Sequence, residues 1–138
     1  MMARTRNAAK TMSAGFDFWN ETKAKMPRLA FLRIKEAVLG KRYELSVAIV
    51  GASKMRSLNK RWRDKDAPTD ILSFSLSKSS GEIYLSPGEA KKEAVKFDRT
   101  YDNFILFLFI HGLVHLKGYD HGAIMESIET KFRKRFGI

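Results

Sequence analysis

Hydrophobic positions along the chain change between helical spacing and strict alternation, which predicts short strands interleaved with helices. Apolar residues recur at helical spacing over 27–39, 89–97, 102–117 and 123–136. Another predicted helix begins at Ser53, a candidate N-cap, and ends before Pro68. They alternate with polar residues over 44–50, 71–76 and 82–86, and briefly over 16–19. This order of elements favours an α+β fold, in which helices cover a small mixed β-sheet.

The same patterns assign side chains to faces. A turn at 79–81 would pair the strand 71–76 with the next one as an antiparallel hairpin, which Pro87-Gly88 would end. In 71–76 the residues expected to face a core are Leu72, Phe74 and Leu76, and those expected to face a groove or water are Ser73 and Ser75. In the last helix the inward set is Ile124, Ile128 and Phe132, and the outward set is Lys131, Arg133, Lys134 and Arg135.

Length and composition restrict the class of protein. A chain of 138 residues that is 44% hydrophobic predicts one domain over 1–138, in which 1–26 include a short flexible or strand-forming leader. A transit peptide is the weaker alternative for the basic N-terminal segment. The absence of cysteine excludes disulfides, thiolate metal ligands and a cysteine nucleophile. The longest apolar run, 104–116, is too short to span a bilayer and indicates a buried core helix.

The chain is strongly basic. It has 26 Lys and Arg against 15 Asp and Glu, a formal net charge of +11. Such an excess favours a polyanionic partner, either nucleic acid or an anionic lipid surface, although it would also serve simply to keep the surface solvated.

All three histidines lie between positions 111 and 121. His111 and His115 are four residues apart on a predicted helix, so their rings share one face, and Gly118 can adopt the left-handed conformation that brings His121 back over them. Three neutral imidazoles suit Zn²⁺ and leave its fourth position open to water, as in catalytic zinc sites. The alternative is three ordinary histidines in a helix and turn. Gly112 would provide either room beside the site or a tight contact between the helix and the sheet.

The histidine spacing also occurs in metzincin proteases, where a Glu directly after the first histidine is the general base. Here that position is Gly112. Without a carboxylate at this point of the helix, hydrolysis of peptides by the zinc-protease route is disfavoured.

Two sequence blocks resemble the YbeY family of bacterial endoribonucleases. HGLVHLKGYDH, at 111–121, is similar to the family signature HGxLHLxGYDH. LNKRWRDKDAPTDILSF, at 58–74, is similar to LNxxYRxKDxPTDVLSF, with Trp62 and Ile71 in place of the usual Tyr and Val. Gly81-Glu82-Ile83 matches the short strand that follows in the family.

The resemblance implies a small α+β domain with a metalloprotease-like zinc helix and one Zn²⁺ held by His111, His115 and His121. It makes Arg63 the catalytic arginine near the metal. It further implies a cytoplasmic, zinc-dependent endoribonuclease of single-stranded rRNA precursors. The expected partner is the small ribosomal subunit, the expected product the mature 3′ end of 16S rRNA, and a further role ribosome quality control.

Other assignments stay open at the level of sequence. Asp120 would orient a histidine, cap the turn or act as a base, and Asp70 would pair with Arg63 or end a turn. Trp62 and Tyr119 would stack on bases or belong to the core. The basic residues expected beside the histidines are Arg56, Lys60, Arg61, Arg63 and Lys65.

Two alternative functions are kept. One is a ribosome-binding maturation factor with a mainly structural metal, whose fourth ligand would be Asp120 or Glu82. The other is a metal-dependent hydrolase of small molecules or peptides. The general base, the choice between water and the RNA 2′-OH as nucleophile, and the oligomeric state are left open.

Overall fold

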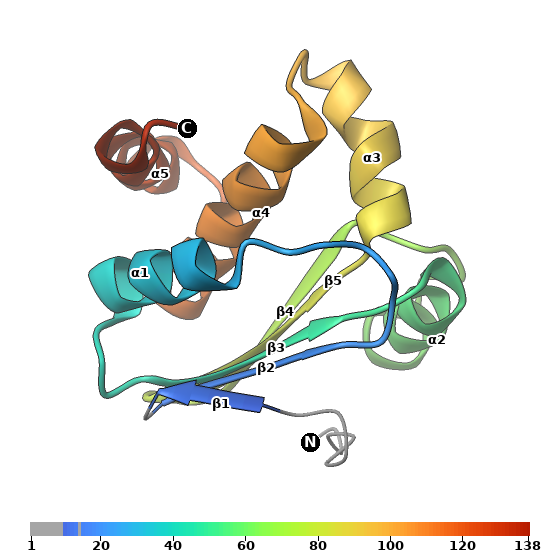
Figure 1. The fold of residues 1–138 in the computed structure, drawn as a ribbon, viewed down its shortest axis with the longest axis horizontal. Helices are drawn as coiled ribbons and strands as arrows, with labels where there is room; N and C mark the ends of the chain where they lie inside the picture. The colour runs from blue at the N-terminus through green and yellow to red at the C-terminus, as the bar shows by residue number, and fades with distance from the viewer. Residues whose placement is uncertain (1–9, 14) are drawn as a thin grey trace.

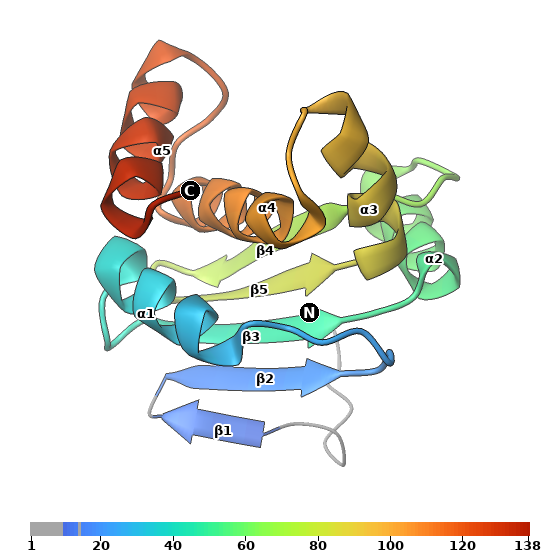
Figure 2. The ribbon, with the colours of Figure 1, turned by 45° about the horizontal axis from the view of Figure 1, so that its top comes forward.

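The computed structural model describes residues 10–13 and 15–138, and five strands form one mixed sheet (Figures 1 and 2). The strands are β1 (Lys10–Ser13), β2 (Phe16–Asn20), β3 (Glu44–Ile49), β4 (Ile71–Ser77) and β5 (Ser80–Leu85). They lie in the order β1-β2-β3-β5-β4, with parallel pairing of β2, β3 and β5 and antiparallel strands at both edges. The mixed sheet and the 71–76 hairpin are as predicted. Positions 1–9 and 14 of the expected leader lie outside the described residues, whereas 10–13 form a strand.

The described part of the chain also contains five helices, which complete the α+β fold: α1 (Arg28–Leu39), α2 (Ala52–Arg63), α3 (Pro87–Lys96), α4 (Tyr101–Leu116) and α5 (Ala123–Phe136). In Figure 1, α1, α3, α4 and α5 lie on one side of the sheet, and α2 lies on the other. No helix among the described residues is both long enough and apolar enough to cross a membrane.

Alternating strand residues supply two separate cores. Val47 and Ile83 belong to the larger cluster with α1 and α4, while their neighbours Ala48 and Tyr84 belong to the smaller cluster with Met55 of α2. The sheet is therefore buried on both faces over its inner strands, which explains why β3 and β5 are apolar on nearly every residue.

Helix α4 is the buried helix that the apolar run predicts. Thr100 caps its first turn by accepting a hydrogen bond from the backbone N–H of Asn103. Most of its residues are buried, because the sheet packs on one side of it and α1, α3 and α5 on the others. His111 and His115 therefore lie on a helix that is packed on several sides.

Three assignments of side chains to strand and helix faces are wrong. Leu76 is 44% exposed, because a register shift between Ser75 and Ser77 interrupts the regular alternation at the end of β4. Ile124 is 69% exposed, since Met125, Glu129 and Phe132 form the inward face of α5. Arg133, expected outward, lies largely covered beside Glu129.

Three element boundaries also differ from expectation. Ser53 lies inside α2, and Gly51 takes the N-cap position. Pro87 does not end the strand but begins α3, where its missing N–H costs no helical hydrogen bond. The hairpin turn lies at 78–79, one residue earlier than predicted, so Gly81 belongs to β5.

Gly112 lies in close contact with the sheet. A Cβ atom at this position would lie 2.8 Å from Ser73 Oγ, 2.9 Å from Ile71 Cδ1 and 3.2 Å from Ile83 Cδ1. Since real Cβ atoms do not approach other heavy atoms so closely, any other residue would require these side chains to shift. Of the two interpretations of Gly112, the tight contact with the sheet is therefore the one observed.

We expect Gly112→Ala to destabilise the protein by about 1–3 kcal/mol, because the added methyl group overpacks the contact with β4 and β5. Equilibrium urea unfolding, with chelator present throughout, measures the change. Gly88→Ala is the matched control: it also lies in a helix, and its added Cβ meets no atom within 4 Å. Equal stability of the two variants would show that the close contact does not constrain α4.

Candidate metal centre

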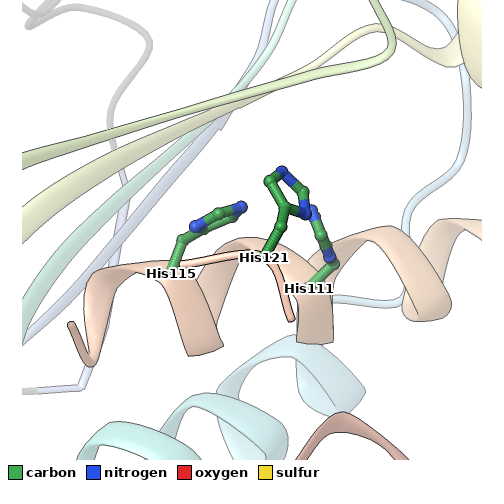
Figure 3. Close-up of side chains that lie close together, drawn as sticks. All are labelled: His111, His115 and His121. Atoms are coloured by element: carbon green, nitrogen blue, oxygen red, sulfur yellow. The ribbon is translucent and has the colours of Figure 1, made fainter. Parts of the chain in front are cut away.

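Three imidazole rings meet above α4 (Figure 3). Ring centroids lie 4.7 Å apart for His111 and His115, 5.3 Å for His111 and His121, and 4.8 Å for His115 and His121. One ligand atom from each ring lies within 4.8 Å of the others. The group can hold a metal ion, and it combines two residues one helical turn apart with one from the following loop.

The loop after α4 is shaped by glycines. Gly118 has φ of +109°, a conformation that side chains other than glycine rarely adopt, and it follows directly on the last helical turn. The chain reverses there and carries His121 back over the helix, as the sequence predicts. Gly122, with φ of +152°, follows His121 before α5 begins.

Two of the rings are held through Nδ1. His111 Nδ1 lies 2.9 Å from Glu129 Oε1, and His115 Nδ1 donates to the carbonyl oxygen of Tyr119 at 3.1 Å. With Nδ1 as the hydrogen-bond donor, Nε2 is the nitrogen left to bind a metal. The donor set therefore fits a metal ion on chemical grounds: two of its three imidazoles are held in the tautomer that exposes a free lone pair.

Glu129 is the functional residue that sequence reasoning missed. Its side chain is 6% exposed, and Arg133 Nη1 lies 3.8 Å from the same Oε1 that contacts His111. The signal was its position four residues after Met125 and three before Phe132, on the inward face of α5. An acidic residue on a buried helical face needs a polar partner, and here it has two.

Electrostatics also favour a neutral ring at His115. Burial, followed by the neighbouring His111, lowers the pKa of His115 from its ordinary value. A neutral imidazole has the lone pair that metal binding requires, so the environment prepares this ring for coordination.

Beside the histidines lies an open cavity of about 500 Å³, which we call the arginine recess. Its walls are formed by Arg63 of α2, by β4 residues including Ser73 and Ser75, and by the histidines with Asp120. The prediction that Ser73 and Ser75 face a groove is confirmed. Because α2 and α4 cover opposite faces of the sheet, Arg63 reaches the recess around the edge strand β4.

Arg63 is held at that edge by two contacts. Its Nη2 donates to the carbonyl oxygen of Ser73 at 3.0 Å, and its guanidinium lies 5.5 Å from the centroid of the Phe74 ring. The remaining N–H groups of the fork are available to an anion in the recess. The structure thus brings together the residues that the sequence singled out 48 positions or more apart, on separate elements.

Asp70 is not the partner of Arg63. It lies on the far side of the centre, and its pKa is raised by burial and by the nearby carboxylate of Glu93. Asp120 lines the arginine recess and is exposed, whereas Glu129 and the Tyr119 carbonyl hold the rings of His111 and His115. Tyr119 itself packs against the core, and Trp62 is 36% exposed with Arg61 over its ring.

Glu82 cannot supply a fourth ligand. Its neighbours Ile83 and Leu85 face α4, so Glu82 and Tyr84 point to the opposite face, where the buried Tyr84 hydroxyl interacts with Glu82. Among the described residues the metal-binding group contains the three histidines alone. Gly112 faces the sheet, and a carboxylate at that position would have no space there.

The fold is a mixed β-sheet covered by helices, with three histidines that can hold a metal ion and an arginine at the sheet edge. The sequence pattern of the family described as Endoribonuclease YbeY matches residues 15–137. The chain belongs to this family.

Individual relatives agree with that assignment. The Endoribonuclease YbeY of Francisella philomiragia is 35% identical over 111 residues, covering 69% of this chain and 70% of that protein. The Endoribonuclease YbeY of Oceanobacillus iheyensis is 34% identical over 122 residues, covering 78% and 77%. The solution structure of TM1509 from Thermotoga maritima is similar to this fold with a TM-score of 0.63 at 28% identity, covering 88% of this chain and 89% of that one.

We expect Glu129→Gln to weaken metal binding about tenfold, because the amide no longer favours the His111 tautomer as a carboxylate does. Competition with a chromophoric chelator for Zn²⁺ measures the affinity. Glu126→Gln is the control, since Glu126 lies on the same helix and contacts Arg133 but not a histidine. Equal Zn²⁺ affinities of the two variants would contradict the role of Glu129.

Proposed function

We propose that the chain is a zinc-dependent endoribonuclease acting on single-stranded RNA, with one Zn²⁺ held by His111, His115 and His121. The observation that carries the proposal is that these histidines and Arg63 line one open recess. Membership in the endoribonuclease family supports RNA as the substrate. Three nitrogen ligands that leave a position open favour a catalytic over a structural site.

The residues around the centre would have separate roles in cleavage. A zinc ion bound there would polarise a phosphoryl oxygen and lower the pKa of bound water. Arg63 would bind the phosphate oxygens and stabilise the negative charge that develops on them during cleavage. Its bond to Ser73 O fixes the guanidinium before substrate arrives, so little freedom is lost on binding. Glu129 and the Tyr119 carbonyl would hold His111 and His115 in their metal-binding tautomer.

Basic residues of α2 extend from Arg63 along an exposed surface. Lys60 and Arg61 lie on the helix and Lys65 directly after it, and all three are exposed. Arg56 is engaged with Asp66 at 2.6 Å. We infer that the exposed cations attract the RNA backbone without regard to sequence and that their contribution weakens with salt.

The proposal extends to the biological substrate. By its resemblance to the family, we infer that the enzyme processes rRNA precursors in the cytoplasm, notably at the 3′ end of 16S rRNA, and acts on defective ribosomes. The small ribosomal subunit is then its partner. By the same resemblance its RNA is expected to be single-stranded.

The test is cleavage of a precursor of small-subunit rRNA by purified, metal-quantified protein, with the products mapped at their ends. We expect His115→Ala to lose both zinc and cleavage. Arg63→Ala is expected to keep zinc but to lower kcat/KM by about 10²–10³, since it removes a group that stabilises transition-state charge.

Arg42→Ala controls for the loss of one positive charge. Arg42 is exposed in the turn between α1 and β3 and does not line the recess, so cleavage should change little. Full activity of Arg63→Ala would remove that residue from the mechanism. Absence of cleavage by zinc-loaded wild-type protein would refute the nuclease function itself.

A further inference from the structure

A second cavity lies on the other side of the histidines. It has a volume of about 340 Å³ and is enclosed by α3, α4 and α5, and we call it the aromatic recess. His111, His121 and Ile71 line both this cavity and the arginine recess. A ligand that reaches the centre from one recess therefore has a direct path into the other.

The two recesses differ in the charged groups that line them. The arginine recess offers a guanidinium, hydroxyls and imidazoles together with the carboxylate of Asp120, whereas the lining of the aromatic recess contains four carboxylates and no Lys or Arg. These are Asp70, Glu93, Glu126 and Glu129. A phosphate group would find no cationic side chain in this lining to bind it. An uncharged part of the same molecule could enter it.

The apolar walls of the cavity suit a flat ring. Phe97 lies at the end of α3, is 53% exposed, and contacts the rings of Phe104 and Phe107 at centroid distances of 5.1 and 5.7 Å. Met125 of α5 lines the same cavity. A base of single-stranded RNA can stack on an exposed aromatic ring of this kind.

The carboxylates define which base fits. Asp70 and Glu93 both line the cavity, and the pKa of Asp70 is raised, first by burial and then by the nearby Glu93. Carboxylates accept hydrogen bonds but donate none when ionised, so a ligand that presents N–H donors would stabilise the ionised Asp70 that burial disfavours. Cytosine, adenine and guanine carry an exocyclic amino group, whereas uracil presents carbonyl oxygens in its place.

We propose that the aromatic recess binds the base of a nucleotide next to the cleaved phosphodiester, and that it prefers a base with an exocyclic amino group to uracil. Phe97 stacks on the base, and Asp70 and Glu93 accept its amino hydrogens. The inference rests on the proposed nuclease function, to which it adds a base preference. It makes Phe97, Asp70 and Glu93 specificity-determining residues in a recess that the arginine and the metal do not occupy.

The test uses cytidine and uridine 5′-monophosphates, which have equal charge and nearly equal size and contain no phosphodiester to cleave. Their affinities for the zinc-loaded full chain are measured by NMR titration, which also reports which residues shift. We expect the cytidine nucleotide to bind about tenfold more tightly, with shifts at Phe97 and Met125. Equal affinities in the wild-type protein, or shifts confined to the arginine recess, would overturn the inference.

Variants separate stacking from hydrogen bonding. Phe97→Ala should weaken both nucleotides about tenfold, and Val95→Ala, at an 80% exposed position of α3 outside the recess, should weaken neither. Asp70→Asn should remove the difference between the two nucleotides, and Glu93→Gln tests the same point at a second position should Asp70→Asn fold poorly. A preference that survives in both amide variants would refute the assigned hydrogen bonds.

Cleavage of precursor rRNA by the same preparation separates this inference from the proposed function. Cleavage by a protein that binds both nucleotides equally would leave the nuclease function standing and refute the base recess. A preference for the cytidine nucleotide in a protein that cleaves no RNA would support the recess as a base site and refute the nuclease function.

Discussion

The approach of α4 to the edge of the sheet is the constraint on which the site depends. At Gly112 the helix backbone lies so near Ser73, Ile71 and Ile83 that a methyl group has no space. That contact sets the distance between the histidines on α4 and β4, and it is from the far side of β4 that Arg63 reaches the recess. A bulkier residue at 112 would require the side chains of Ser73, Ile71 and Ile83 to move, and Arg63 is bonded to Ser73 O on the same strand. The candidate metal ligands and Arg63 are thus kept together by the packing of α4 on β4.

Buried polar contacts orient the histidine rings within this packing. Glu129 lies between His111 and Arg133, so that a carboxylate almost removed from water has a partner on either side. This arrangement couples α5 to α4 through one hydrogen bond, and it selects the ring nitrogen that faces the centre. The Tyr119 carbonyl does the same for His115 from the loop that Gly118 turns. The orientation of the histidine rings therefore depends on α4, the loop that follows it and α5.

The division of charge around the centre bears on how a substrate lies. Arg63 and the exposed cations of α2 are on one side, and the carboxylates of the aromatic recess are on the other. The net charge of +11 is consequently not spread evenly around the site. A polyanion is attracted from the α2 side, whereas the opposite recess accepts uncharged or donor groups. The spacing shared with zinc proteases carries no matching carboxylate on α4, in accord with a phosphate-directed rather than a peptide-directed centre.

The sequence by itself determined the order of helices and strands from Phe16 onward, the buried character of α4, the turn at Gly118 and the convergence of three histidines. Each of these follows from local periodicity or local backbone conformation, which neighbouring residues along the chain control. Sequence reasoning mistook Ile124 for a core residue, missed Glu129 and left the use of Gly112 undecided, because an amphipathic pattern defines a broad face of a helix but not which residue meets a neighbour. Only the tertiary structure decided that Glu129 orients His111, that Asp70 lies away from Arg63 and that two recesses flank the histidines. Those relations join segments far apart in the chain, and their distances depend on how closely whole elements pack.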